Sequence, residues 1–160
     1  MTVVYQVRYR RPVVSPLMER RYASSSADGA VVEFGLVRRV LLAKLASGEI
    51  RREDVCDAHP ELLRAAKNLG RPSGERCPVC QAGELVEVTY VFGARLPAGG
   101  TCPTTRAELS KFERREEPVQ CYAVEVCTGC SFHHLARKWS AGGRRRRASV
   151  MASKASKASQ

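Results

Sequence analysis

Two cysteine pairs carry the strongest chemical signal in the sequence. Each pair is a Cys-x-x-Cys, a spacing that lets one tight turn direct two thiolates at a single metal ion. The four cysteines are Cys77, Cys80, Cys127 and Cys130. Together they supply the tetrahedral ligand set of a structural Zn²⁺ site, which leaves no position for a reacting water. In the second turn we expect Gly129 to adopt a positive φ angle.

The two pairs are separated by 46 residues, between Cys80 and Cys127. A site built from both pairs therefore requires a sheet that brings two distant turns together. The alternative is a pair of redox dithiols. A thioredoxin-like motif is expected beside a βαβ pattern, however, and neither pair has that context. We therefore favour the structural zinc site.

Three other cysteines bring the total to seven, an odd number that argues against the fully paired disulfide framework of a secreted protein. We therefore expect a reducing, cytoplasmic location. Cys56 and Cys121 lie beside apolar residues and are predicted to be small buried side chains. Cys102 falls in a glycine-rich stretch and is predicted to be the most exposed thiol.

The sequence His59-Pro60-Glu61, ahead of the first cysteine pair, partly matches a zinc deaminase signature in which the glutamate is the general acid and base. The match is incomplete, because arginine stands where that signature has proline and because the second cysteine pair would go unused. The simpler interpretation is a helix that starts with Pro60 in its first turn. His133 and His134 are strand neighbours that should point to opposite faces, beside the metal or at the surface rather than as ligands.

The net charge of +11 is concentrated at the two ends of the chain. Residues 1–27 carry a net charge of +4, residues 28–136 carry −1, and residues 137–160 carry +8 with no acidic side chain. The central part is therefore nearly neutral, and any attraction to a polyanion should act mainly through the C-terminal tail. No run of about 20 apolar residues suits a membrane helix, and the N-terminus does not have the pattern of a signal peptide.

The basic side chains of the tail are suited to contacts with phosphates of RNA or DNA. These candidate nucleic-acid-binding residues are Arg144, Arg145, Arg146, Arg147, Lys154 and Lys157. The alternative is a solvated, low-complexity end without a function of its own. The tail has no interleaved aromatic residues on which bases could stack.

Hydrophobic periodicity predicts the secondary structure. A helix is expected over residues 32–46, with an apolar stripe of Phe34, Val37, Leu41 and Leu45 and with Arg38 on the opposite side. A second helix should begin at Pro60 and end at Gly70, and residues 71–74 should form a linker. Residues 104–117 should contain a short helix capped by Thr104 or Thr105. Alternating patterns predict strands over residues 86–92, 119–126 and 132–139.

These elements predict a small α+β domain, in which a helical head packs on a three-stranded antiparallel zinc ribbon. The domain should span residues 30–139. It should lie between a flexible basic arm at residues 1–29 and a disordered basic tail at residues 140–160.

The chain also resembles a small uncharacterised actinobacterial family, a domain of unknown function with a helical head and a CPxC…CxxC zinc-ribbon-like region. The resemblance covers roughly residues 31–136, and it supports one continuous domain with a metal site. It rests on five segments, which are residues 32–39, 54–66, 88–93, 124–130 and 134–135. It implies no reaction.

We expect a binding module that is not an enzyme, in which the basic tail associates with RNA, DNA or a ribonucleoprotein complex and no membrane is involved. One alternative is a protein–protein adaptor of unknown pathway. A second alternative is an enzyme, either a thiol-redox protein or the deaminase considered above. Zinc ribbons recur in transcription and translation complexes, an analogy at the level of the fold alone.

Overall fold

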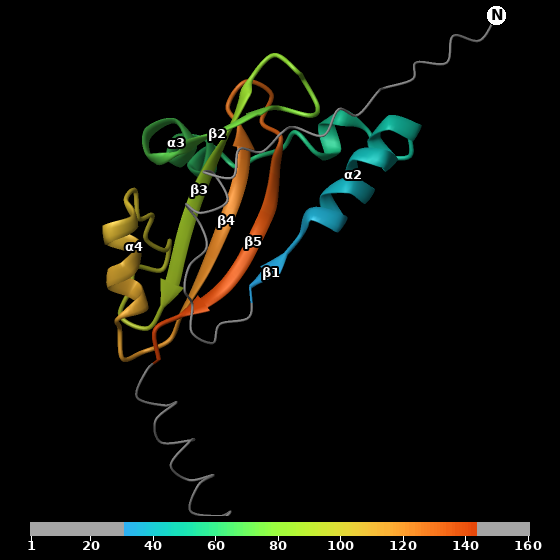
Figure 1. The fold of residues 1–160 in the computed structure, drawn as a ribbon. Coiled ribbons are helices and arrows are strands. Elements are labelled where there is room, and N and C mark those ends of the chain that lie inside the picture. Colours follow the sequence, from blue (N-terminus) through green and yellow to red (C-terminus); the bar gives the residue numbers. More distant parts are fainter. Residues whose placement is uncertain (1–30, 144–160) are drawn as a thin grey trace, which may run out of the picture.

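The computed structural model describes residues 31–143 of the 160-residue chain. A five-stranded antiparallel sheet with the strand order β1-β5-β4-β3-β2 forms its centre (Figure 1). Around it lie three α-helices and one 3₁₀ turn. In chain order the elements are β1 (Val32–Glu33), α2 (Gly35–Ser47), a 3₁₀ turn (Arg52–Asp54), α3 (Pro60–Leu69), β2 (Arg71–Arg76), β3 (Glu84–Gly93), α4 (Arg106–Glu113), β4 (Val119–Cys127) and β5 (His133–Ala141).

The sheet has five strands rather than the predicted three. The three predicted strands are β3, β4 and β5, the long central ones. β2 occupies residues that were expected to be a linker, because Pro72 and Gly74 usually interrupt strands. Proline is tolerated in an edge strand, however. β2 lies at the edge of the sheet, and its Pro72 pairs with Val86 of β3. β1 has only two residues, too few to produce a periodic signal.

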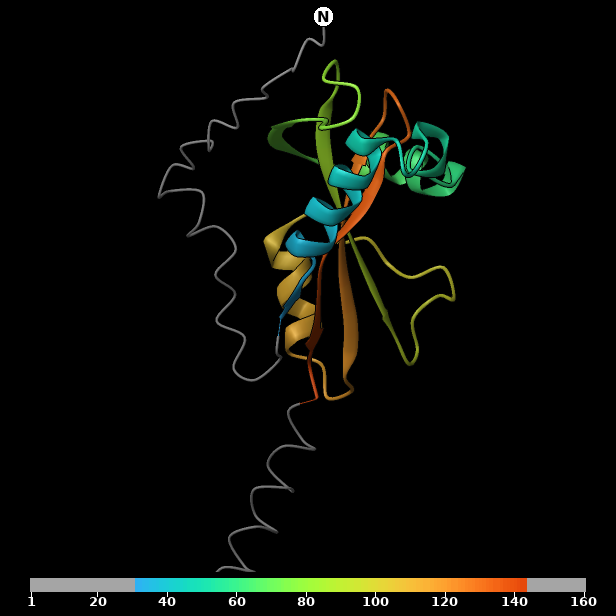
Figure 2. The ribbon, with the colours of Figure 1, turned by 90° about the vertical axis from the view of Figure 1, so that its right-hand side faces the viewer.

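The helices cover different parts of the two sheet faces. Figure 2 shows α3 and the loop that follows β3 on one side of the sheet and α4 on the other. α3 packs through Leu62, Leu63 and Ala66 on Val88 and Val126. On the other face, buried residues such as Val91, Cys121 and Trp139 pack with side chains from α4. The core is therefore divided among several clusters along the sheet.

The second predicted helix agrees closely with α3. Pro60 is in its first turn, the helix ends before Gly70, and the His59 Nδ1 atom accepts a hydrogen bond from the Glu61 N–H at 3.2 Å. The short helix predicted in residues 104–117 is also present as α4. Its N-cap is Thr105, whose hydroxyl accepts a hydrogen bond from the Glu108 N–H.

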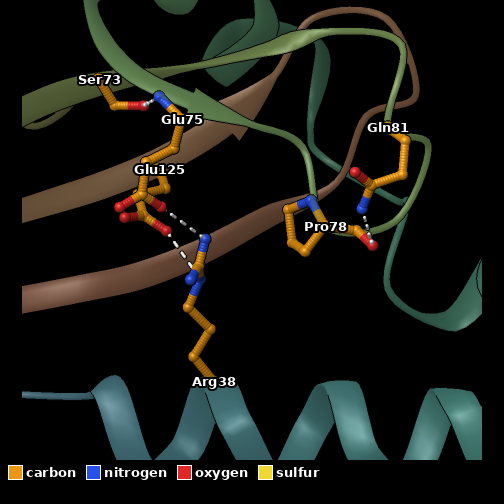
Figure 3. Close-up of polar contacts among 6 residues, drawn as sticks. All are labelled: Arg38, Ser73, Glu75, Pro78, Gln81 and Glu125. Atoms are coloured by element: carbon orange, nitrogen blue, oxygen red, sulfur yellow. Dashed lines mark hydrogen bonds and ion pairs between the residues drawn. The ribbon is translucent and has the colours of Figure 1, made fainter. Parts of the chain in front are cut away.

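α2 buries the predicted apolar stripe only in part. Leu41, Leu42 and Leu45 pack on the sheet, whereas Val37 is 56% exposed. Arg38, expected to face solvent, instead points at the sheet, where Nε lies 3.1 Å from Glu125 on β4 and Nη2 lies 3.5 Å from Glu75 on β2 (Figure 3).

The half-buried carboxylate of Glu125 explains why Arg38 faces the sheet. Burial raises the pKa of Glu125, and the Arg38 guanidinium opposes that shift. Because an unpaired buried charge is costly, the pairing of Arg38 with Glu125 favours the face of α2 that carries arginine over the face that carries Val37. Hydrophobic periodicity in the sequence does not predict this ion pair.

β5 continues to Ala141, two residues beyond the predicted end of the third strand. The Gly143 N–H then donates a hydrogen bond to the Arg115 carbonyl, in the segment between α4 and β4. The residues before 31 and after 143 lie outside the described structure, and so do the predicted arm and most of the predicted tail. Within residues 31–143, no helix has the length and apolar character that crossing a membrane requires.

Candidate metal centre

Two turns at the same end of the sheet hold the four cysteines. Cys77 and Cys80 lie in the turn between β2 and β3, and Cys127 and Cys130 lie in the turn between β4 and β5 (Figure 1). Because β3 pairs with β4, the two turns are neighbours even though the sequence separates them. The four Sγ atoms all lie within 4.8 Å of one another. The predicted convergence of the four cysteines is confirmed.

The shortest contacts in the cluster join one turn to the other. The Sγ atoms of Cys77 and Cys130 are 3.6 Å apart, and those of Cys80 and Cys127 are 3.7 Å apart. The Zn–S bond is about 2.3 Å long, so sulfurs at the corners of a tetrahedron around zinc lie roughly 3.7 Å apart. The donor set and its geometry therefore fit one tetrahedral metal ion bound by four thiolates.

The two turns have closely related backbone conformations. In the first, the Gln81 N–H donates to the Cys77 carbonyl at 3.0 Å, and in the second the Ser131 N–H donates to the Cys127 carbonyl at 2.9 Å. Gln81 and Ser131 both have positive φ angles, 59° and 64°. The positive φ predicted for Gly129 is wrong, because the left-handed residue is the one that follows Cys130.

Backbone dipoles and burial act in opposite directions on the thiols. Backbone N–H groups, chiefly that of Gly83, lower the pKa of Cys80 to about 6. Burial raises the pKa of Cys77 to about 12 and also raises that of Cys127. A bound cation would compensate the cost of burying the thiolates, because a thiol that coordinates a metal is deprotonated. The cluster is therefore suited to a metal-bound state.

Gly83 lies against the cluster because it has no side chain. A Cβ atom at this position would stand 2.9 Å from the Cys127 Sγ, closer than real Cβ contacts. At Gly129, by contrast, a Cβ would be 3.8 Å from the same sulfur, an ordinary contact distance. Gly83 was not among the residues predicted for the site, and its position three residues after Cys80 is the only sequence signal.

A fifth cysteine adjoins the site. The Sγ of Cys56, in the segment after the 3₁₀ turn, is 3.9 Å from the Sγ of Cys130. Interaction with the Cys56 sulfur, and more weakly with that of Cys130, raises the pKa of Arg52. Cys56 is half-buried and packs on the core around the cluster. It was predicted only as a small buried residue, and the contact with Cys130 depends on tertiary packing.

The other two cysteines lie away from the cluster. Cys121 is fully buried on β4, as predicted, and burial raises its pKa to about 12. Cys102 is half-buried rather than exposed, because it packs beside Tyr90 and the residues under α3. The prediction of an exposed Cys102 thiol is therefore wrong.

None of the three histidines belongs to the cysteine cluster among the described residues. His133 and His134 do point to opposite faces, since they pair with Val126 and Glu125 respectively. The His133 Nδ1 lies 3.6 Å from an Asp57 carboxylate oxygen, and the His134 Nε2 lies 3.2 Å from the Phe34 carbonyl. His59 caps α3, consistent with the helix-start interpretation.

The candidate nucleic-acid-binding residues lie outside residues 31–143. They are Arg144, Arg145, Arg146, Arg147, Lys154 and Lys157. The last described residues, Gly142 and Gly143, lie at the opposite end of β5 from the cysteine turns.

Comparison with known proteins places the chain among relatives of unknown function. The sequence profile of a family of unknown function, DUF5318, matches residues 26–155. Uncharacterised proteins of Mycobacterium bovis and of two strains of Mycobacterium tuberculosis are each 40% identical over 114 residues, which is 71% of this chain and 83% of theirs. No solved structure matches the chain.

The close contact at Gly83 generates a prediction. In Gly83→Ala, the added methyl should push the Cys127 Sγ out of position and weaken metal binding by at least about tenfold, in the range found when the support of a metal ligand is lost. Competition with a chromophoric chelator measures this affinity. The matched variant Gly129→Ala adds a methyl at an ordinary contact distance of 3.8 Å from the same sulfur and should bind metal as the unsubstituted chain does. Equal affinities for both variants would contradict the steric argument.

Proposed function

We propose that this chain, which belongs to the DUF5318 family of unknown function, is a zinc-ribbon binding module without catalytic activity that associates with nucleic acid through its basic C-terminal tail. The observation that carries the first part is the cluster of four cysteine sulfurs. The charge distribution of the sequence supports the second part. A cytoplasmic location accords with the seven unpaired cysteines.

The arrangement of the cluster supports zinc and a structural role. Four sulfur ligands at tetrahedral separations suit Zn²⁺, although iron also binds such a set. With Cys77, Cys80, Cys127 and Cys130 all bound, the ion would have no vacant position for a substrate or a water. Two hairpins, β2–β3 and β4–β5, would then be joined by the ion at one end of the sheet, which is the arrangement expected of a zinc ribbon.

Removal of the metal tests the structural role. We expect one zinc per chain by elemental analysis of anaerobically prepared protein, and we expect a chelator to unfold the domain, because metal-binding energy is also folding energy. Circular dichroism during chelation provides the measurement. Cys130→Ser should lower the zinc content, whereas Cys102→Ser, which alters a half-buried cysteine outside the cluster, should retain it. Metal loss without any change in the thermal unfolding temperature would rule out the structural role.

The tail supports association with a polyanion. Six basic and no acidic side chains follow Gly143, whereas the part from residue 28 to residue 136 is nearly neutral. Phosphate contacts of this kind release counterions and give affinity that falls steeply with salt, without sequence preference. The function of the tail would therefore be to hold the folded domain close to a nucleic acid.

Deletion of residues 144–160 tests the tail. A deletion from residue 140 would instead remove the end of β5 and the Gly143 hydrogen bond. With six cations removed, the slope of log affinity against log salt for single-stranded nucleic acid should become shallower by up to about 4. Binding titrations at several salt concentrations measure it. Arg39→Gln, a change at an exposed position on α2, should leave the slope almost unchanged. A truncated chain with the original slope would exclude the tail as the cause.

One observation favours the alternative of a protein–protein adaptor. Three apolar side chains near the start of α2 face solvent, with Leu36 70% exposed and Val37 and Val40 each 56% exposed. Val31 and Val32, beside them in the sequence, are also exposed. Contiguous exposed apolar side chains often mark protein interfaces.

The adaptor function makes a separate prediction. A partner that uses the α2 surface should co-purify after nuclease treatment and tail deletion, and the double change Val37→Ser and Val40→Ser should reduce its recovery by at least about tenfold. Quantitative affinity capture measures this recovery. Ala43→Ser, also at an exposed position on α2, serves as the matched control. Recovery that persists in the double variant would remove the α2 surface from consideration.

A further inference from the structure

Three aromatic side chains gather on the sheet face that carries α3. Tyr90 and Phe92 are alternate residues of β3, and Tyr122 is the direct partner of Tyr90 on β4. All three therefore lie on the same face as Val88 and Val126, which α3 covers. α3 covers the half of this face near the cysteine turns, and the aromatic residues continue the face toward the other end. We call Tyr90, Phe92 and Tyr122 the aromatic surface.

The three rings of the aromatic surface contact one another and are partly exposed to solvent. Tyr90 and Phe92 stack with centroids 6.1 Å apart and planes inclined by 16°, and Phe92 and Tyr122 make a T-shaped contact with centroids 5.7 Å apart. Phe92 is 37% exposed. The loop after β3 holds one side of this ring, because Gly100 lies so close that a Cβ there would stand 2.7 Å from it.

A cavity of about 580 Å³ adjoins the aromatic surface. The three rings form part of its wall, and Leu62 of α3 and Leu135 of β5 add apolar groups. The volume is in the range of pockets that hold small planar ligands or parts of larger ones. Partly exposed aromatic rings beside an open, mostly apolar cavity have a shape and chemistry that suit stacking with a flat, unsaturated ring.

The polar groups at the cavity include hydrogen-bond donors. His59 lies on the wall, and because its Nδ1 accepts the Glu61 N–H, the proton of the neutral ring is on Nε2. His133 also lines the cavity. The acidic residue on the wall is Glu61, and Arg64 pairs with it at 2.8 Å, so its charge is compensated. The wall therefore has no uncompensated negative charge that would repel a phosphate chain.

Positive charge lies on the open side of the aromatic surface. The Lys138 Nζ is 5.5 Å from the centre of the Tyr122 ring. Lys138 is the partner of Tyr122 across the β4–β5 pair, so the two are neighbours on the same sheet face. Further along β5 the chain reaches Gly143, which lies beside Pro118, and the four arginines follow directly in the sequence. Among the described residues, a cation therefore lies directly beside the aromatic surface.

We propose that the aromatic surface binds unpaired bases of a single-stranded nucleic acid, with the bases stacked on Phe92 and Tyr122 and the phosphates near Lys138. This inference rests on the proposed association with nucleic acid and assigns the part of the fold that contacts the bases. Stacking on aromatic side chains together with nearby cations is a general mode of single-strand binding. In a duplex the bases are already stacked on each other, so a duplex gains nothing from these rings.

The experiment compares a single-stranded dT12 oligonucleotide with a duplex of the same length, using the full chain and fluorescence anisotropy. Phe92→Leu and Tyr122→Leu remove a ring and keep an apolar side chain. Each should weaken dT12 binding by at least about fivefold and leave duplex binding unchanged, since stacking on one ring contributes about that much or more. Tyr122→Phe keeps the ring and should bind dT12 with nearly the original affinity. Leu36→Ala, a change at an exposed residue on α2, is the matched control.

The outcomes separate this inference from the proposed function. If the leucine variants bind dT12 as tightly as the unsubstituted chain does, the aromatic surface does not bind bases, whatever the tail does. If replacing Arg144, Arg145, Arg146 and Arg147 by glutamine leaves the salt dependence unchanged, the proposed role of the tail fails, and the ring variants still test the stacking. Unchanged circular dichroism and zinc content are required of every variant.

Ultraviolet crosslinking of the unsubstituted chain to dT12 gives a second test that needs no variant. Mass spectrometry of the digested complex should find crosslinks on the peptides that contain Phe92 or Tyr122, because bases stacked on a ring are in contact with it. Crosslinks confined to residues 144–160 would overturn the proposal.

Discussion

The convergence of four thiols at one end of the sheet is the constraint on which the rest of the structure depends. Cys77 and Cys80 come from one hairpin turn and Cys127 and Cys130 from another, and only the long pairing of β3 with β4 makes these turns neighbours. Leu85 and Phe132 pack with cysteines of the same cluster, and leucine side chains of α2 pack against this core. A change in the relative position of the two hairpins would disturb the cluster, the apolar core beneath it and the attachment of the first helix together.

Features with a local cause could be predicted from the sequence. The Cys-x-x-Cys spacing predicted both turns, alternation predicted the three long strands, and Pro60 and Thr105 marked helix starts. The features that sequence reasoning missed depend on tertiary partners. The face of α2 is determined by Arg38 and a half-buried Glu125 on a distant strand, and the contact between Cys56 and Cys130 joins residues 74 positions apart.

The two sheet faces have different characters, and this difference organises the surface of the molecule. One face is closed, since α4 and part of α2 cover it and ion pairs such as that of Arg137 with Glu87 lie within it. The other face is closed by α3 near the cysteine turns and open where the aromatic residues lie. An alternating strand pattern predicts only that one face is more apolar, because the coverage of each half depends on where the helices pack.

The length of β5 has an electrostatic consequence. Its nine residues separate the cysteine turns from the point at which the chain leaves the described structure, a distance of roughly 30 Å at the usual rise per strand residue. Charges exposed to water are screened over about 8 Å at physiological ionic strength. Gly143, the last described residue, therefore lies several screening lengths away from the cysteine sulfurs. Any influence of metal occupancy on that end of the molecule must be transmitted mechanically, through the integrity of the paired strands, and not by the field of the ion.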